Sequence, residues 1–195
     1  IFLGLSAVGI YSAAYAIGSL VHLFITPIQF ILFPELSRLY DEERIDDVRN
    51  YLSSSLRYFL LIAIPAVVGL TVLAKQVLQI LTTSDFVAGS IIIPFIALSG
   101  LLGGVFQIVI NITHLVKKTQ FNLFIHILAA VANIVLNVAL IPFIGILGAA
   151  IATLASYSLM VIVVIHISFR DLSFDLGYGF ILKCVVASGV MAGVL

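Results

Sequence analysis

Amide, imidazole and phenol side chains recur at helical spacing within three long apolar stretches of this sequence. Such side chains donate and accept hydrogen bonds without a full charge, which suits them either to binding sugar hydroxyls or to joining helices inside a membrane. Because a helix turns about 100° per residue, residues spaced 4, 7 or 11 apart share one face. The candidate cavity-lining residues are His22, Gln29, Gln107, Asn111, His114, Asn122 and His126.

Each of the three stretches carries its polar residues on a single edge. Polar groups that face lipid are costly, so we expect these edges to face other helices or a water-filled cavity. Two interpretations stay open, a hydrophilic cavity or hydrogen bonds between helices, and the second is favoured for Asn133 and Asn137. The three edges comprise Tyr15, His22, Thr26 and Gln29; Gln107, Asn111 and His114; and Asn122, His126, Asn133 and Asn137.

Long apolar helices must position these residues. The chain has 195 residues, of which 63% are hydrophobic and 9% charged, whereas soluble domains average about 25% charged residues. A hydrocarbon core about 30 Å thick needs about 20 apolar helical residues to cross it. We therefore expect one all-α domain, a polytopic membrane helix bundle with about six transmembrane helices. The expected helices cover about 8–35, 51–81, 87–116, 120–141, 146–168 and 178–195.

Prolines and one charge cluster predict where the helices bend or end. Proline removes an intrahelical hydrogen bond and clashes with the preceding turn, so we expect bends at Pro27 and Pro65. The first helix should end near Pro34 and the fourth should stop at Pro142. Charges are dense over residues 37–50, which should be exposed to water and are compatible with a short amphipathic helix on the membrane surface.

The basic residues fall in alternate gaps between the expected helices. Of the nine Lys and Arg residues, only Lys75 lies toward the other side, and the gaps at 82–86 and 142–145 contain none. Cytoplasmic loops of membrane proteins carry an excess of Lys and Arg. The pattern predicts a multi-pass plasma-membrane protein with three cytoplasmic loops, at 37–50, 117–119 and 169–177.

Two cations lie slightly inside the predicted cytoplasmic ends of their helices. Arg57 and Lys183 either extend to the membrane surface along their long stems or point inward and contact an anionic head group. Both alternatives stay open. Acidic residues are absent from the middle of every predicted span, so this stretch offers no obvious proton-coupling site.

The sequence favours no catalytic, metal or nucleic-acid site. Its four His residues lack Cys, Asp or Glu partners at metal-ligand spacing, and Cys184 has no plausible base nearby. A net charge of zero argues against a nucleic-acid surface. We expect a protein that is not an enzyme and that has no cofactor, no metal and no nucleic-acid partner.

Several short segments resemble one transporter family in their order and spacing. Residues 8–17 (VGIYSAAYAI), Pro27 and residues 32–39 (LFPELSRL) resemble the polysaccharide flippases of the multidrug/oligosaccharidyl-lipid/polysaccharide exporter superfamily. Residues 133–137 (NIVLN) and 145–153 (GILGAAIAT) resemble the asparagine helix and the glycine-alanine helix start of the same family. The likeness covers most of residues 8–168.

The resemblance implies a flippase with two six-helix lobes around a hydrophilic cavity, of which this chain supplies most of the C-terminal lobe. Such proteins carry a lipid-linked oligosaccharide from the cytoplasmic to the outer leaflet during polysaccharide biosynthesis. The implied partners are this substrate, membrane lipid and the N-terminal lobe of the same protein. The resemblance assigns no individual site residue.

Two other functions remain compatible with the sequence. One is an ion-coupled multidrug or metabolite exporter of the same superfamily, which should carry a buried carboxylate. The other is a non-transporting membrane scaffold of a glycan-assembly complex, which predicts that every polar edge is satisfied by contacts between helices. Flipping of a lipid-linked peptidoglycan precursor is a substrate variant of the first hypothesis.

Overall fold

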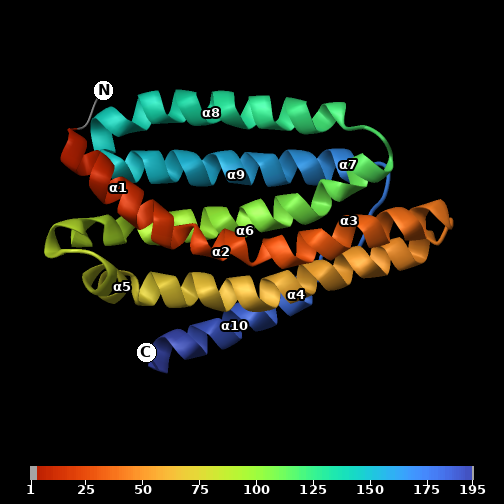
Figure 1. Ribbon diagram of the computed structural model, residues 1–195, viewed down its shortest axis with the longest axis horizontal. Coiled ribbons are helices and arrows are strands. Elements are labelled where there is room, and N and C mark those ends of the chain that lie inside the picture. Colours follow the sequence, from red (N-terminus) through yellow and green to blue (C-terminus); the bar gives the residue numbers. More distant parts are fainter. Residues whose placement is uncertain (1–3, 195) are drawn as a thin grey trace.

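The computed structural model describes residues 4–194, and every regular element in this range is helical. Among the described residues, five helical stretches are long and apolar enough to cross a membrane. They lie side by side along the long axis of the molecule, with their connections at its two ends (Figure 1). This is the architecture of a multi-pass membrane protein, and it confirms the expected all-α helix bundle.

The first span is built from three consecutive helices, α1 (Leu5–Gly18), α2 (Leu20–Leu23) and α3 (Ile25–Asp41). Pro27 cannot donate a backbone hydrogen bond to Leu23, and its ring crowds that carbonyl. The interruption at Phe24 therefore lies in the turn before the proline. A second interruption at Ser19, whose hydroxyl donates to the Ala16 carbonyl at 3.0 Å, was not expected from the sequence.

The first span continues past Pro34 to Asp41, farther than the expected end at residue 35. Ion pairs one turn apart stabilise this extension, with Arg38 bonded to Glu35 at 2.5 Å and to Glu42 at 2.8 Å. Only a short turn separates α3 from α4 (Ile45–Val72). The hypothesis of a surface helix over residues 37–50 is therefore wrong, because this segment forms the tip of a helical hairpin.

The second and third spans begin earlier than expected. The second consists of α4, which passes through Pro65 without interruption, and α5 (Ala74–Leu81), with a break at Leu73. The third opens with the 3₁₀ helix η1 (Ser84–Ile92) and continues as α6 (Ile93–Val109) and α7 (Asn111–Leu115). Transmembrane helices tolerate proline where neighbouring groups satisfy the freed backbone.

The last three helices are α8 (Gln120–Ile144), α9 (Ile146–Ser168) and α10 (Tyr178–Val194). Contrary to expectation, α8 runs through Pro142 and ends at Ile144. Gly145, with φ of 58°, makes the tight turn into α9, a conformation that glycine adopts readily. The expected sixth helix corresponds to α10, and Leu195 lies outside the described residues.

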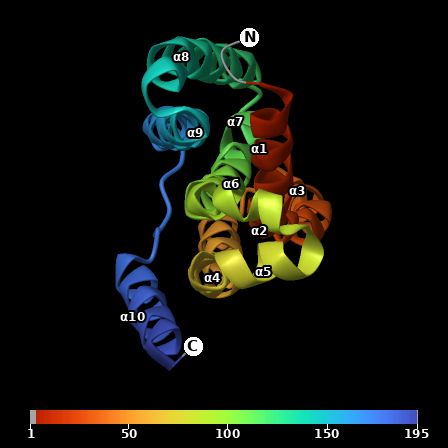
Figure 2. The ribbon, with the colours of Figure 1, turned by 90° about the vertical axis from the view of Figure 1, so that its left-hand side faces the viewer.

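Helix α6 lies at the centre of the bundle and packs against α9, α4, α1 and α2 (Figure 2). Glycines permit these close approaches. A Cβ atom added to Gly104 would collide with the Phe59 ring of α4, and one added to Gly18 would lie 2.7 Å from Cβ of Ile96. By contrast, α8 packs mainly on α9, and only 6% of its most apolar stretch is buried.

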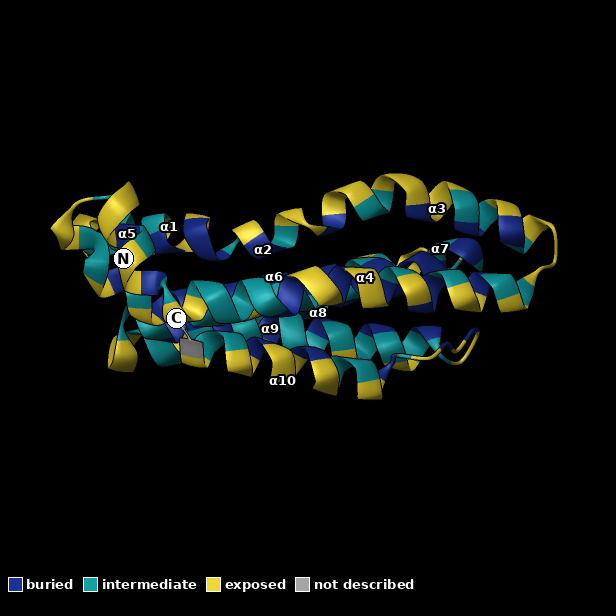
Figure 3. Ribbon diagram, turned by 90° about the horizontal axis from the view of Figure 1, so that it is seen from below, coloured by how far each residue is buried: buried dark blue, intermediate teal, exposed yellow. Residues whose placement is uncertain are grey.

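The α3–α4 hairpin, the α7–α8 turn and the α9–α10 loop lie at the same end of the molecule (Figures 1 and 3). An ion pair of 2.6 Å between Lys118 and Asp171 joins the second of these connections to the third. We call this the basic end, since the gaps that the sequence analysis found rich in Lys and Arg meet there. Lys75, on α5, lies toward the opposite end.

Candidate functional site

Two adjoining pockets form a groove between α1, α2, α6, α8 and α9. One has a volume of about 180 Å³ and the other about 310 Å³, and both are lined by Tyr15, Thr153 and Tyr157. We call this region the polar groove. Its remaining polar lining residues are Ser19, His22 and Ser99 in the first pocket, and His126, Asn133 and Ser156 in the second.

Glycine at position 103 allows three helices to converge on the polar groove. A Cβ atom at Gly103 would lie 2.9 Å from Nδ1 of His22 and 3.1 Å from Cε1 of Tyr157. The same His22 nitrogen lies 3.4 Å from the Gly100 carbonyl oxygen. These contacts bring α2, α6 and α9 together and direct the His22 and Tyr157 side chains toward the groove.

Three hydroxyl groups of the groove already use their hydrogen atoms in hydrogen bonds to the backbone. Ser99, Thr153 and Ser156 each donate a hydrogen bond to a carbonyl of their own helix, at 2.7, 2.9 and 2.8 Å respectively. The lone pairs of these three oxygens therefore remain able to accept hydrogen bonds. Tyr, His and Asn side chains supply donors beside them. The groove therefore offers both donors and acceptors, as binding of sugar hydroxyls requires.

His126 lines the second pocket of the groove from α8. Its Nδ1 lies 2.8 Å from the Asn122 carbonyl oxygen of the preceding turn. The ring also packs edge-on against Phe106 of α6, with 5.4 Å between centroids. His22 and His126, predicted from the sequence as cavity-lining, are thus both found along one groove.

Asn122 and His114 meet nearer the basic end. Asn122 Nδ2 lies 3.3 Å from His114 Nε2, which links α8 to α7. Within residues 4–194 the Asn122 Oδ1 atom is buried and has no hydrogen-bond partner. Asn122 and His126 also line a shallow pocket of about 380 Å³ that extends from the groove toward this end.

Gln29, Gln107 and Asn111 form a contact between helices. The Gln29 side-chain amide of α3 donates to the Gln107 carbonyl oxygen at 2.8 Å. The Asn111 amide donates to the same oxygen at 2.7 Å, and its residue is only 3% exposed. This geometry favours the helix-joining interpretation for Gln29, and Asn111 bonds the same carbonyl from within its own span, whereas Gln107 contributes only its backbone carbonyl. Cavity lining stays a hypothesis for the other candidates.

Asn133 and Asn137 bond each other along α8. The Asn137 amide donates to Oδ1 of Asn133 at 2.8 Å. This is a bond within one helix, whereas the sequence favoured bonds between helices. Asn133 also lines the polar groove.

The fifth span also contributes to the groove, which was not expected from the sequence. Thr153 and Tyr157 are spaced four residues apart on α9 and line both pockets. That spacing is a signal of the same kind as the three polar edges that were recognised. The short hydroxyl side chains of Ser19 and Ser99 gave no such signal.

Arg57 and Lys183 lie in a separate open pocket of about 560 Å³ at the basic end. Arg57 pairs with Asp175 at 2.6 Å, and the other Asp175 oxygen accepts a 2.8 Å hydrogen bond from the Gly177 backbone N–H. The Gly177 and Arg57 bonds hold the pKa of the Asp175 carboxyl below its ordinary value. We call this the basic pocket.

The described residues contain no group of three or more His, Cys, Asp or Glu side chains that could hold a metal ion. Cys184 is a buried free thiol on α10.

A family model for the lipid II flippase MurJ matches residues 2–195. The chain belongs to the MurJ flippase family. This agrees with the resemblance to polysaccharide flippases noted in the sequence. A solved structure described as lipid II flippase MurJ in an inward closed conformation superposes with a TM-score of 0.80 at 20% identity, over 96% of this chain and 40% of that one.

Two curated proteins of Haloferax volcanii are similar to this MurJ-family chain. One, a probable low-salt glycan biosynthesis flippase named Agl15, is 29% identical over 195 residues, which is all of this chain and 41% of Agl15. The other, a probable flippase named AglR, is 32% identical over 160 residues, covering 81% of this chain and 34% of AglR. The chain thus spans between a third and two fifths of the length of these relatives.

Proposed function

We propose that the protein is a flippase that moves a lipid-linked oligosaccharide from the cytoplasmic to the outer leaflet of the plasma membrane. The observation that carries this proposal is the polar groove, a hydrogen-bonding surface set between apolar helices of a MurJ-family chain. A glycan head group needs many hydrogen-bond partners and shielding from hydrocarbon, whereas its polyprenyl tail can remain in lipid.

In this function the groove residues contact the glycan, and the remainder of the bundle contacts the membrane. His22 and His126 contact sugar hydroxyls, together with Tyr15, Thr153 and Tyr157. The groove is completed by a second lobe, and catalysis plays no part. Loops 37–50, 117–119 and 169–177 face the cytoplasm, because the basic residues gather at that end.

The proposal is tested by flipping in proteoliposomes. A lipid-linked oligosaccharide with a fluorescent sugar is incorporated with the protein, and the fraction accessible to a membrane-impermeant quencher is followed over time. Removing two groove hydroxyls with Thr153→Val and Tyr157→Phe should slow flipping about tenfold, since each hydrogen bond contributes about 0.5–1.5 kcal/mol.

Matched controls lie outside the groove. Thr71 and Tyr58 are exposed residues of α4, so Thr71→Val with Tyr58→Phe should leave flipping unchanged. An absence of glycan flipping by the unmodified protein, or equal rates in the two double variants, would overturn the proposal.

A further inference from the structure

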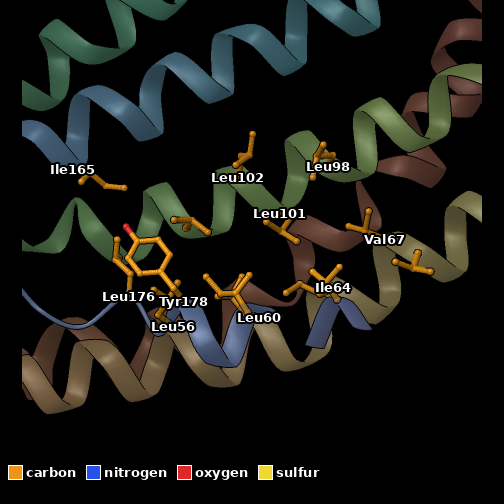
Figure 4. A pocket seen from close by; sticks show the side chains of 14 residues that line it. Leu56, Leu60, Ile64, Val67, Leu98, Leu101, Leu102, Ile165, Leu176 and Tyr178 are labelled. Atoms are coloured by element: carbon orange, nitrogen blue, oxygen red, sulfur yellow. The ribbon is translucent and has the colours of Figure 1, made fainter. Parts of the chain in front are cut away.

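A second elongated groove lies between α4, α6 and α10 and has a volume of about 470 Å³. Apolar side chains line it, including Leu60 and Ile64 of α4, Leu101 and Leu102 of α6, and Ile181 and Val185 of α10. Figure 4 shows these helices contributing side chains to a common space. We call it the apolar groove. Its volume lies within the range of about 300–1,000 Å³ typical of ligand pockets.

The apolar groove adjoins the basic pocket at one end. Tyr178 lines both cavities, and its ring lies among Leu56, Leu60 and Leu176 at that end (Figure 4). Tyrosine is enriched where membrane hydrocarbon meets the head groups. The apolar groove, Tyr178 and the two cations are therefore neighbours in the half of the molecule nearer the basic end.

The basic pocket has a positive charge in excess. Arg57 is paired with Asp175, but a guanidinium has five N–H donors and this ion pair leaves several of them free. Lys183 makes no ion pair with any carboxylate in the described part of the chain. Two cations against one carboxylate give the pocket a net charge complementary to a phosphate.

This composite site is separate from the polar groove. Helix α6 presents Ser99 and Gly100 to the polar groove, but it presents Leu98 and Leu101 to the apolar groove. The two grooves share no lining residue. A phosphate bound beside Lys183 therefore lies on the opposite face of α6 from a sugar bound beside Tyr157.

We propose that the apolar groove and the basic pocket together bind one anionic phospholipid of the surrounding membrane. An acyl chain lies between α4, α6 and α10, and the phosphate contacts Lys183 and the free N–H groups of Arg57. Apolar and basic surface lie side by side in this half of the molecule, which suits the acyl chain and the phosphate of a lipid in the leaflet at the basic end. Each Lys or Arg near the membrane surface raises the affinity for anionic lipid by about a few-fold. The proposal is independent of whether the protein transports a glycan.

Fluorescence quenching by brominated lipids tests this site. The chain contains no tryptophan, so Val185→Trp places a reporter at the groove, and the protein without it gives the background. In phosphatidylcholine vesicles, a minor fraction of brominated phosphatidylglycerol should quench the reporter more than the same fraction of brominated phosphatidylcholine. Lys183→Gln should weaken the phosphatidylglycerol response up to about tenfold, and Lys183→Arg should retain it.

Lys117→Gln is the matched control, because it removes an exposed positive charge at the same end of the molecule but outside the pocket. Equal quenching by both lipids, or an equal loss in the Lys117 and Lys183 variants, would overturn the proposal. Two competitors identify the occupant. Displacement by soluble glycerol phosphate would show a free-phosphate site, and preferential displacement by a polyprenyl phosphate would show a carrier-lipid site. Either result would refute a phospholipid site, while glycan flipping is scored separately.

Discussion

Gln29 of α3 and Gln107 of α6 are joined by a 2.8 Å hydrogen bond from the Gln29 side-chain amide to the Gln107 backbone carbonyl oxygen. This carbonyl lies just before the interruption between α6 and α7, and the Asn111 side chain also donates to it. Two side chains thus satisfy a backbone acceptor at a break in the third span. The contact connects the first and third spans.

Replacing Gln29 by alanine should therefore lower the stability of the bundle. Hydrogen bonds between transmembrane helices contribute about 0.6–2 kcal/mol. Gln29→Ala should therefore lower the free energy of unfolding by an amount in this range. Thermal unfolding in detergent measures the change. Gln79→Ala, on an exposed position of α5, should have almost no effect, and a Gln29 variant as stable as this control would contradict the role of the contact.

Gly104 should be intolerant even of alanine. An added Cβ would overlap the Phe59 ring, and overpacking of this kind costs about 1–3 kcal/mol. Combining Gly104→Ala with Phe59→Leu should cost less than the two single changes added together, because the smaller side chain makes room. Unfolding of the four proteins measures the coupling.

Gly189→Ala is the control for this comparison, since an added Cβ there has no atom within 4 Å. Alanine favours a helix over glycine by about 1 kcal/mol, so this variant should be as stable as the parent or slightly more stable. Strict additivity of the Gly104 and Phe59 changes would refute the proposed overlap.

Thiol labelling should distinguish the polar groove from the helix-joining residues. In a Cys184→Ala background, cysteine at His126 or Thr153 should react with a membrane-impermeant, water-soluble reagent, because both positions line the groove. Cysteine at Asn111 should resist, since that position is buried. Labelling is quantified by mass shift. Protection of all three positions would favour a scaffold without a cavity.

Acid should release the N-terminal end of α10. The pKa of the Asp175 carboxyl is lowered first by the Gly177 N–H and then by Arg57. A lowered folded-state pKa means that the contribution of Asp175 to stability is complete above its ordinary value of about 3.9 and is lost as the pH falls through the lowered value. The protection of the amides at residues 177–181 against hydrogen exchange, taken relative to the intrinsic exchange rate at each pH, should fall in that acid range.

Asp175→Asn provides the comparison for the acid experiment. The variant lacks a titrating group at this position, so its exchange at 177–181 should already be faster at neutral pH and should respond less to acid. Identical pH profiles for the two proteins would show that the Arg57–Asp175 pair does not hold this end of α10.

The helical architecture was predictable because hydropathy and charge act over whole segments, but helix ends depend on contacts between particular side chains. Arg38 extends α3 by pairing with Glu35 and Glu42, and no hydropathy pattern reports this. Proline was informative in only one case. Pro27 interrupts the first span one turn earlier, while Pro65 and Pro142 lie within continuous helices.

The candidate site was predictable only in part, because one polar edge of a helix can either line a cavity or bond a neighbouring helix. His22 and Gln29 belong to the same edge of the first span, yet His22 lines the groove and Gln29 bonds α6. Whether a residue lines the groove or bonds another helix depends on how the helices cross. At Gly103, for example, the close approach of α2 and α9 places His22 beside the groove. Spacing in one sequence carries no information about that crossing.

The sparse packing of α8 has a consequence for biosynthesis. This helix is the most apolar of the five spans and also the least covered by the rest of the chain. Because α9 is its main neighbour and is synthesised later, partition of the α8 side chains from the translocon into lipid must retain α8 until α9 follows. Helix α9 can then dock onto α8 after the turn at Gly145, so the two helices enter the bilayer in the order of their synthesis.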